Sequence, residues 1–102
     1  MDVKVGSRWK SAVCSTEIII VRAPVEPVSL ACGGHEVVTM TAERFAGATP
    51  DLGQTDGTQL GKRYTDEATG IEVLCTRSGA GSLTVDGRAL QIKKPKLLPA
   101  SD

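Results

Sequence analysis

The sequence predicts an all-β protein folded as a small barrel or sandwich. Short apolar runs alternate with polar residues and are separated by turn-forming residues, and no segment keeps the period of an amphipathic helix. Short strands with regular turns are typical of two packed sheets or of a small barrel. A chain of 102 residues has the length for one modest core, so we expect a single domain over 1–102.

The two halves of the chain resemble one another, which predicts a degenerate internal repeat. At an offset of 55 residues, the matching pairs are Gly6 with Gly61, Trp9 with Tyr64, Glu17 with Glu72, and Arg22 with Arg77. At an offset of 53, they are Ser29 with Ser82, Leu30 with Leu83, and Gly34 with Gly87. Two unrelated amphipathic hairpins would also share their apolar pattern, but identities at Gly, Arg and Glu are not required by that pattern. We expect two similar halves, with Trp9 and Tyr64 as equivalent core residues.

The repeat assigns two hairpins to each half. The first half, 5–40, pairs 5–13 with 16–22 and 28–32 with 35–40. The second half, 60–92, pairs 60–65 with 71–77 and 82–85 with 88–92. The glycine-punctuated stretch 41–59 joins them as a long loop, and 93–102, with its prolines and lysines, is expected to be a loose tail.

The charge and the apolar pattern restrict the partners. Twelve basic and twelve acidic residues balance to zero, which gives no basic surface for nucleic acid. No apolar run approaches the roughly 18 residues that a membrane span needs. The first residues alternate like a strand and contain no apolar signal segment, which indicates a cytoplasmic protein. We expect a protein partner or a second copy, as a homodimer that covers the sheet edges.

The three cysteines and the single histidine are the candidate site. The Cys-Gly-Gly-His run at 32–35 reads as a hairpin turn that sets Cys32 opposite His35, with Cβ atoms about 5 Å apart on one side. Cys14 lies at the tip of the preceding expected hairpin. Three thiolates and one imidazole are a standard tetrahedral set for zinc. We predict a zinc site of Cys14, Cys32, His35 and Cys75 with a structural or accessory role rather than a catalytic one.

Cys75 is the least securely placed member of this set. It lies inside an expected strand, and it reaches the same end only if the halves pack head to tail. If it does not, three ligands would leave an open zinc position. The alternative for both Cys14 and Cys75 is that they are small buried apolar residues.

Two other functions fit the same residues. A metal-free accessory module would bind a larger protein through its sheet edges or through the loop 41–59. A thiol enzyme would use His35 to activate Cys32, with the amides of Gly33 and Gly34 as oxyanion donors. That enzyme also needs a third group to orient the histidine, and the sequence offers none.

Overall fold

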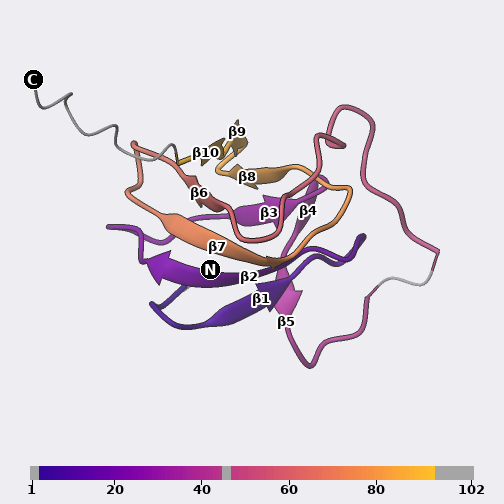
Figure 1. Cartoon of the computed structure of the whole chain (residues 1–102), viewed down its shortest axis with the longest axis horizontal. Coiled ribbons are helices and arrows are strands. Elements are labelled where there is room, and N and C mark those ends of the chain that lie inside the picture. The colour runs from indigo at the N-terminus through magenta and orange to yellow at the C-terminus, as the bar shows by residue number, and fades with distance from the viewer. Residues whose placement is uncertain (1–2, 45–46, 94–102) are drawn as a thin grey trace, which may run out of the picture.

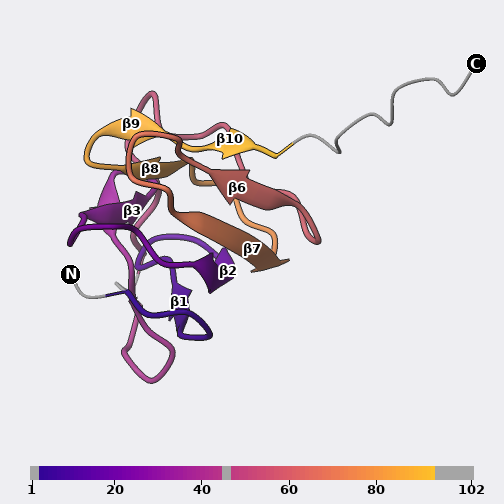
Figure 2. The ribbon, with the colours of Figure 1, turned by 90° about the vertical axis from the view of Figure 1, so that its left-hand side faces the viewer.

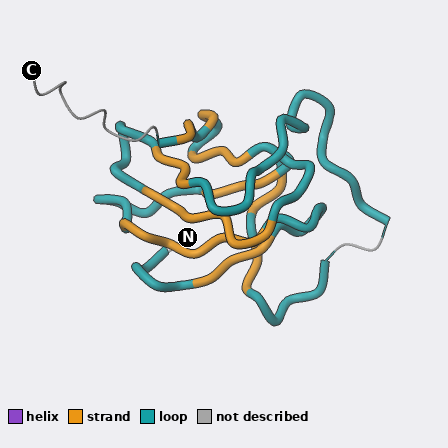
Figure 3. Tube along the Cα trace, viewed as in Figure 1, coloured by secondary structure: helices purple, strands orange, loops and turns teal. Residues whose placement is uncertain are grey.

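A computed structural model describes residues 3–44 and 47–93 of the chain. The described residues form strands and loops, with no helix among them (Figure 1; Figure 3). The strands are β1 Arg8–Lys10, β2 Glu17–Arg22, β3 Leu30–Cys32, β4 His35–Glu36, β5 Val38–Thr39, β6 Arg63–Thr65, β7 Glu72–Arg77, β8 Leu83–Val85, β9 Arg88–Ala89 and β10 Gln91–Ile92.

The strands form two antiparallel sheets packed as a small sandwich, which confirms the all-β prediction. The larger sheet has the order β10-β6-β7-β2-β1-β5, and the smaller has the order β4-β3-β8-β9. Figure 2 shows β3, β8 and β9 to one side of β2, β7 and β6. Of the two predicted architectures, the structure is the sandwich and not a closed barrel.

The internal repeat is visible in the pairing of the strands. Strands β1 to β5 correspond in order to β6 to β10, with the residue offsets expected from the sequence. The centre of the larger sheet is the β2–β7 pair, where Ile20 lies opposite Val73. The centre of the smaller sheet is the β3–β8 pair, where Cys32 lies opposite Leu83. The two halves are therefore related by an approximate two-fold axis, and each sheet is shared between them.

Two of the expected strands change sheets part-way. The segment 35–40 was expected as one strand, but β4 pairs with β3 in the smaller sheet and β5 pairs with β1 in the larger. Val37 lies at the corner, where it is buried and donates its N–H to Leu30 O at 3.0 Å. Leu90 makes the equivalent corner between β9 and β10 and donates to Leu83 O. Burial of these corner side chains explains the bend, because each remains in the core as the chain crosses between sheets.

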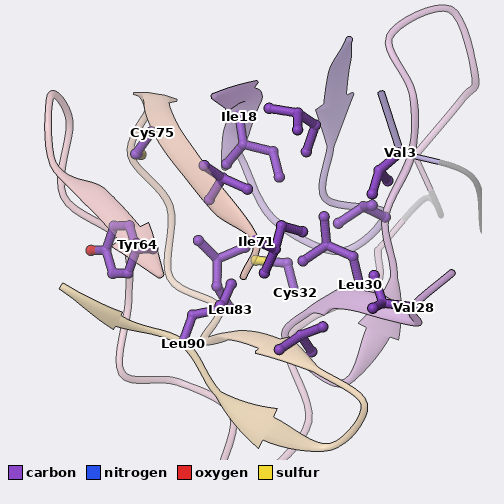
Figure 4. Packing of buried hydrophobic residues seen from close by; sticks show 14 residues of the cluster. Val3, Ile18, Val28, Leu30, Cys32, Tyr64, Ile71, Cys75, Leu83 and Leu90 are labelled. Carbon is purple, nitrogen blue, oxygen red and sulfur yellow. The ribbon is translucent and has the colours of Figure 1, made fainter. Parts of the chain in front are cut away.

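The core lies between the sheets and is mostly aliphatic. It includes Ile18 and Ile20 of β2, Val73 and Cys75 of β7, Leu30 and Cys32 of β3, and Leu83 and Val85 of β8. Figure 4 shows these side chains converging from both layers. Tyr64 is buried as expected, and its equivalent Trp9 is partly buried against the same cluster.

The loop 41–59 lies between β5 and β6, and apart from Phe45 and Ala46 it is described. Its second part returns to the sandwich: Asp51 N donates to Gly33 O at 2.9 Å, and Thr58 forms an isolated bridge with Gly79. Of the expected tail, Lys93 donates to Arg63 O, and 94–102 lie outside the described residues. No described segment forms a helix with the length and apolar character to cross a membrane.

Candidate thiol site

The tip of the β1–β2 hairpin positions Cys14. Ser11 N donates to Thr16 O at 2.9 Å and closes the tip. Inside it, Ser11 Oγ accepts the backbone N–H groups of Val13 and Cys14, both at 3.1 Å. A hydroxyl that caps the amides of the next residues is a favoured way to stabilise a tight turn. The turn leaves Cys14 partly buried, with its side chain toward the core.

Cys32 ends β3 and begins the second hairpin turn. Gly33 and Gly34 follow it with φ angles of 68° and 87°, which only glycine adopts readily. Cys32 is fully buried, and its Sγ lies 3.8 Å from Cys14 Sγ. Two hairpins of the first half therefore bring two of the three cysteines together.

A loop from the second half encloses the two sulfurs. This loop, 78–82, joins β7 to β8. A β carbon added at Gly79 would lie 2.5 Å from Thr16 N and 3.0 Å from Cys14 Sγ. One added at Gly81 would lie 2.8 Å from Gly33 N and 3.0 Å from Cys32 Sγ. Glycine is required at both positions because the loop backbone lies directly against the thiols.

The hydrogen bonds around Cys14 favour its thiolate. Burial raises the pKa of Cys14, but hydrogen bonds from the Ser11 and Thr16 side chains and from the Thr16 and Gly81 backbone outweigh it, and the pKa falls to about 7. Thr16 Oγ1 lies 3.2 Å from Cys14 Sγ. As a thiol Cys14 donates to this oxygen, and as a thiolate it accepts from it.

A chain of buried hydroxyls extends from that sulfur. Thr16 Oγ1 lies 2.9 Å from Thr58 Oγ1, which accepts the Gly79 N–H at 3.0 Å. An amide N–H can only donate, so Thr58 Oγ1 is the acceptor in its contact with Gly79, and the Thr58 hydroxyl proton is available to Thr16 Oγ1. The Thr16 hydroxyl can then donate its own proton to Cys14 Sγ. Each donor in such a chain polarises the next.

Cys32 has the opposite character. Burial first, and the negative charge of Cys14 second, raise the pKa of Cys32 to about 12. When Cys14 is ionised, the Cys32 S–H donates to its sulfur across the 3.8 Å contact. The thiol-enzyme alternative predicted from the sequence made Cys32 the activated thiol. In the structure it is the pKa of Cys14 that is lowered, whereas that of Cys32 is raised.

The other two predicted ligands lie elsewhere. His35 is the register partner of Cys32, but its Nε2 lies 3.0 Å from Asp51 Oδ1, at an exposed position. Cys75 is on β7 opposite Ile18, and its thiol donates to Arg77 O at 3.2 Å. Figure 4 shows Cys75 well apart from Cys32. Among residues 3–44 and 47–93, no group of three or more His, Cys, Asp or Glu side chains is placed to hold a metal ion.

Comparisons with protein-family models, curated proteins and solved structures found no match.

Several residues of the site were not singled out from the sequence: Ser11, Thr16, Thr58, Gly79 and Gly81. Ser and Thr are common at hairpin ends, and their pattern does not distinguish a turn from a thiol environment. The one available signal was the Gly-Ala-Gly run at 79–81, where two closely spaced glycines indicate close backbone approach.

Proposed function

We propose that this protein is a thiol redox protein in which Cys14 and Cys32 interconvert between a dithiol and a disulfide. The observation that carries the proposal is the 3.8 Å separation between the sulfurs of a partly buried cysteine and a fully buried one. Forming an S–S bond of about 2.05 Å requires only a small approach of the two sulfurs. Oxidation removes two electrons and two protons from the pair, and a reducing dithiol returns them.

The two thiols take different roles in this reaction. Cys14 has the low pKa and is the less buried of the two residues, so it is the thiol that reacts first with an external reactant. Cys32 is fully buried and can react only with the sulfur beside it. An accessible, low-pKa thiol next to a second thiol is the arrangement expected of a redox-active pair.

The test is equilibration in buffers of defined glutathione or dithiothreitol potential, followed by alkylation of free thiols and intact-mass analysis. We expect the wild-type chain to lose two thiols together, and Cys75→Ala to behave in the same way. Cys14→Ser and Cys32→Ser should lose this transition. Closing the loop between residues 14 and 32 should also raise the free energy of unfolding by about 3 kcal/mol. A chain that keeps both thiols under strongly oxidising buffer would contradict the proposal.

A second candidate is a zinc ion held by the same two sulfurs. Two thiolates bound to one tetrahedral zinc at about 2.3 Å lie about 3.8 Å apart, which matches the observed separation. The ion would then take its other ligands from outside the pair, from His35 and Cys75 after rearrangement or from a partner. Elemental analysis of the reduced chain decides between the candidates. About one zinc per chain, lost in Cys14→Ser and Cys32→Ser but kept in a surface control such as Thr76→Val, would favour zinc.

A further inference from the structure

We propose that the oxidant of this pair is a small hydroperoxide, which Cys14 reduces through a sulfenic acid that Cys32 resolves. The inference rests on the proposed function and names its substrate class. Three features of the molecule support it: the space around Cys14, the donors that surround its sulfur, and the position of Cys32.

The space around Cys14 favours a small oxidant. Cys14 is partly buried at the hairpin tip, and the backbone at Gly79 lies so close to its sulfur that a β carbon added there would be 3.0 Å from that sulfur. Attack on a disulfide needs three sulfurs nearly in line, and both sulfurs of the attacked disulfide carry a substituent. A hydroperoxide presents only two linked oxygens and can be hydrogen peroxide itself, so it fits this crowded site more easily than a bulky disulfide does.

The donors around the sulfur suit a peroxide. The hydroxyls of Ser11 and Thr16 and the N–H of Gly81 all hydrogen-bond Cys14. Arg44 reaches the same turn, where its Nε donates to Cys14 O at 2.9 Å. When a peroxide lies against Cys14, donors at this position can hydrogen-bond its oxygens and stabilise the negative charge that develops on the departing one.

The chemistry balances with a hydroperoxide ROOH. The Cys14 thiolate attacks the terminal oxygen, the O–O bond breaks, and the leaving alkoxide takes a proton to give ROH, or water from hydrogen peroxide. Cys14 is then a sulfenic acid. The Cys32 sulfur attacks the Cys14 sulfur, its proton and the sulfenic hydroxyl leave as water, and the disulfide forms.

The position of Cys32 makes the second step direct. Its sulfur is already 3.8 Å from that of Cys14, so resolution does not require the buried strand β3 to unfold. In peroxide-reactive proteins, a nearby second thiol protects the sulfenic acid from further oxidation. Burial also keeps Cys32 from reacting with the peroxide itself.

The experiment follows hydrogen peroxide consumption by the reduced full chain, with dimedone present to trap sulfenic acid. We expect one peroxide consumed and one disulfide formed per wild-type chain, about 100-fold faster than with free cysteine. Cys32→Ser should instead carry dimedone on residue 14, and Cys32→Ala repeats this test should the serine variant fold poorly. Cys14→Ser should give neither product, and Cys75→Ala should match the wild type.

Two outcomes would overturn the proposal, and they separate it from the proposed function. If oxidised dithiothreitol or glutathione forms the disulfide while peroxide reacts no faster than with free cysteine, the oxidant is wrong and the redox pair stands. If no oxidant forms the Cys14–Cys32 disulfide, the proposed function fails as well.

Discussion

At the scale of single residues, two cysteines of one protein acquire opposite properties from their surroundings. Cys14 lies among hydroxyl and amide donors, which stabilise negative charge on its sulfur. Cys32 lies deeper, where burial and the neighbouring thiolate both oppose ionisation. The difference decides which sulfur meets the outside reactant.

Thr16→Val should raise the pKa of Cys14. The substitution keeps the shape of the side chain but removes the hydroxyl that lies 3.2 Å from the sulfur. Because the thiolate is the reactive form, the iodoacetamide rate of the wild type should rise with a midpoint near pH 7, and that of the variant at higher pH. A pKa increase of about one unit would lower the thiolate fraction at pH 7 from about one half to about one tenth, so the rate at that pH should fall about fivefold.

Thr76→Val is the matched control, since Thr76 is exposed on β7. Its rate profile should coincide with that of the wild type. An unchanged midpoint in Thr16→Val would show that this hydroxyl does not stabilise the thiolate.

At the scale of elements, the site depends on three segments that meet at one end of the sandwich. The β1–β2 tip holds Cys14, the end of β3 holds Cys32, and the loop 78–82 covers both. The loop 41–59 supports this cover, because Gln54 O accepts the Ser82 N–H at 3.0 Å and Ser82 Oγ accepts the Asp56 N–H at 2.8 Å.

Gly79→Ala should displace the loop from the thiols. Its methyl group would lie 2.5 Å from Thr16 N, which belongs to the backbone and cannot move aside easily. We expect the free energy of unfolding to fall by about 2 kcal/mol, as for other overpacked positions. Urea denaturation of the reduced chain measures this loss. Ser78→Ala, at an exposed position of the same loop, should be close to neutral, and equal stability of the two variants would exclude the close approach.

At the scale of the whole molecule, the two halves share one core and differ in chemistry. Under the repeat, Thr69 stands where Cys14 stands and Val85 where Cys32 stands. The turn itself is kept: Asp66 Oδ2 accepts from Thr69 N and Thr69 Oγ1, as Ser11 Oγ accepts from Cys14 N. The thiol pair is therefore a feature of one half, built on a turn that both halves use.

Because both sheets are shared, we predict that the chain unfolds in a single transition. Ile20→Ala on β2 should lower the free energy of unfolding by about 3 kcal/mol, since Ile20 is 1% exposed and packs against the other half. Ile19→Ala on the outer side of the same strand should cost less. Calorimetry should show one unfolding peak for the wild type and for each of the two variants. Two separate peaks would mean that the halves are independent domains.

Other expectations from the sequence stay predictions. A zinc ion, a homodimer, a protein partner, an accessory role and a cytoplasmic location each require a measurement on the purified protein or in cells. Elemental analysis tests the first, and the concentration dependence of mass in solution tests the second.

The strand-rich fold, the repeat and the Gly33-Gly34 turn could be predicted from the sequence alone. These follow from local periodicity, from spacing and from the φ angles that only glycine adopts easily. The sequence also indicated that the tips bearing Cys14 and Cys32 share one end. The sequence did not show that Cys75 and His35 lie apart from this pair, or that Cys14 is the thiol with the lowered pKa; both depend on the three-dimensional packing. The reason is that the burial of each thiol, and the loop at Gly79 and Gly81 that lies against both sulfurs, depend on how segments distant in the sequence pack together.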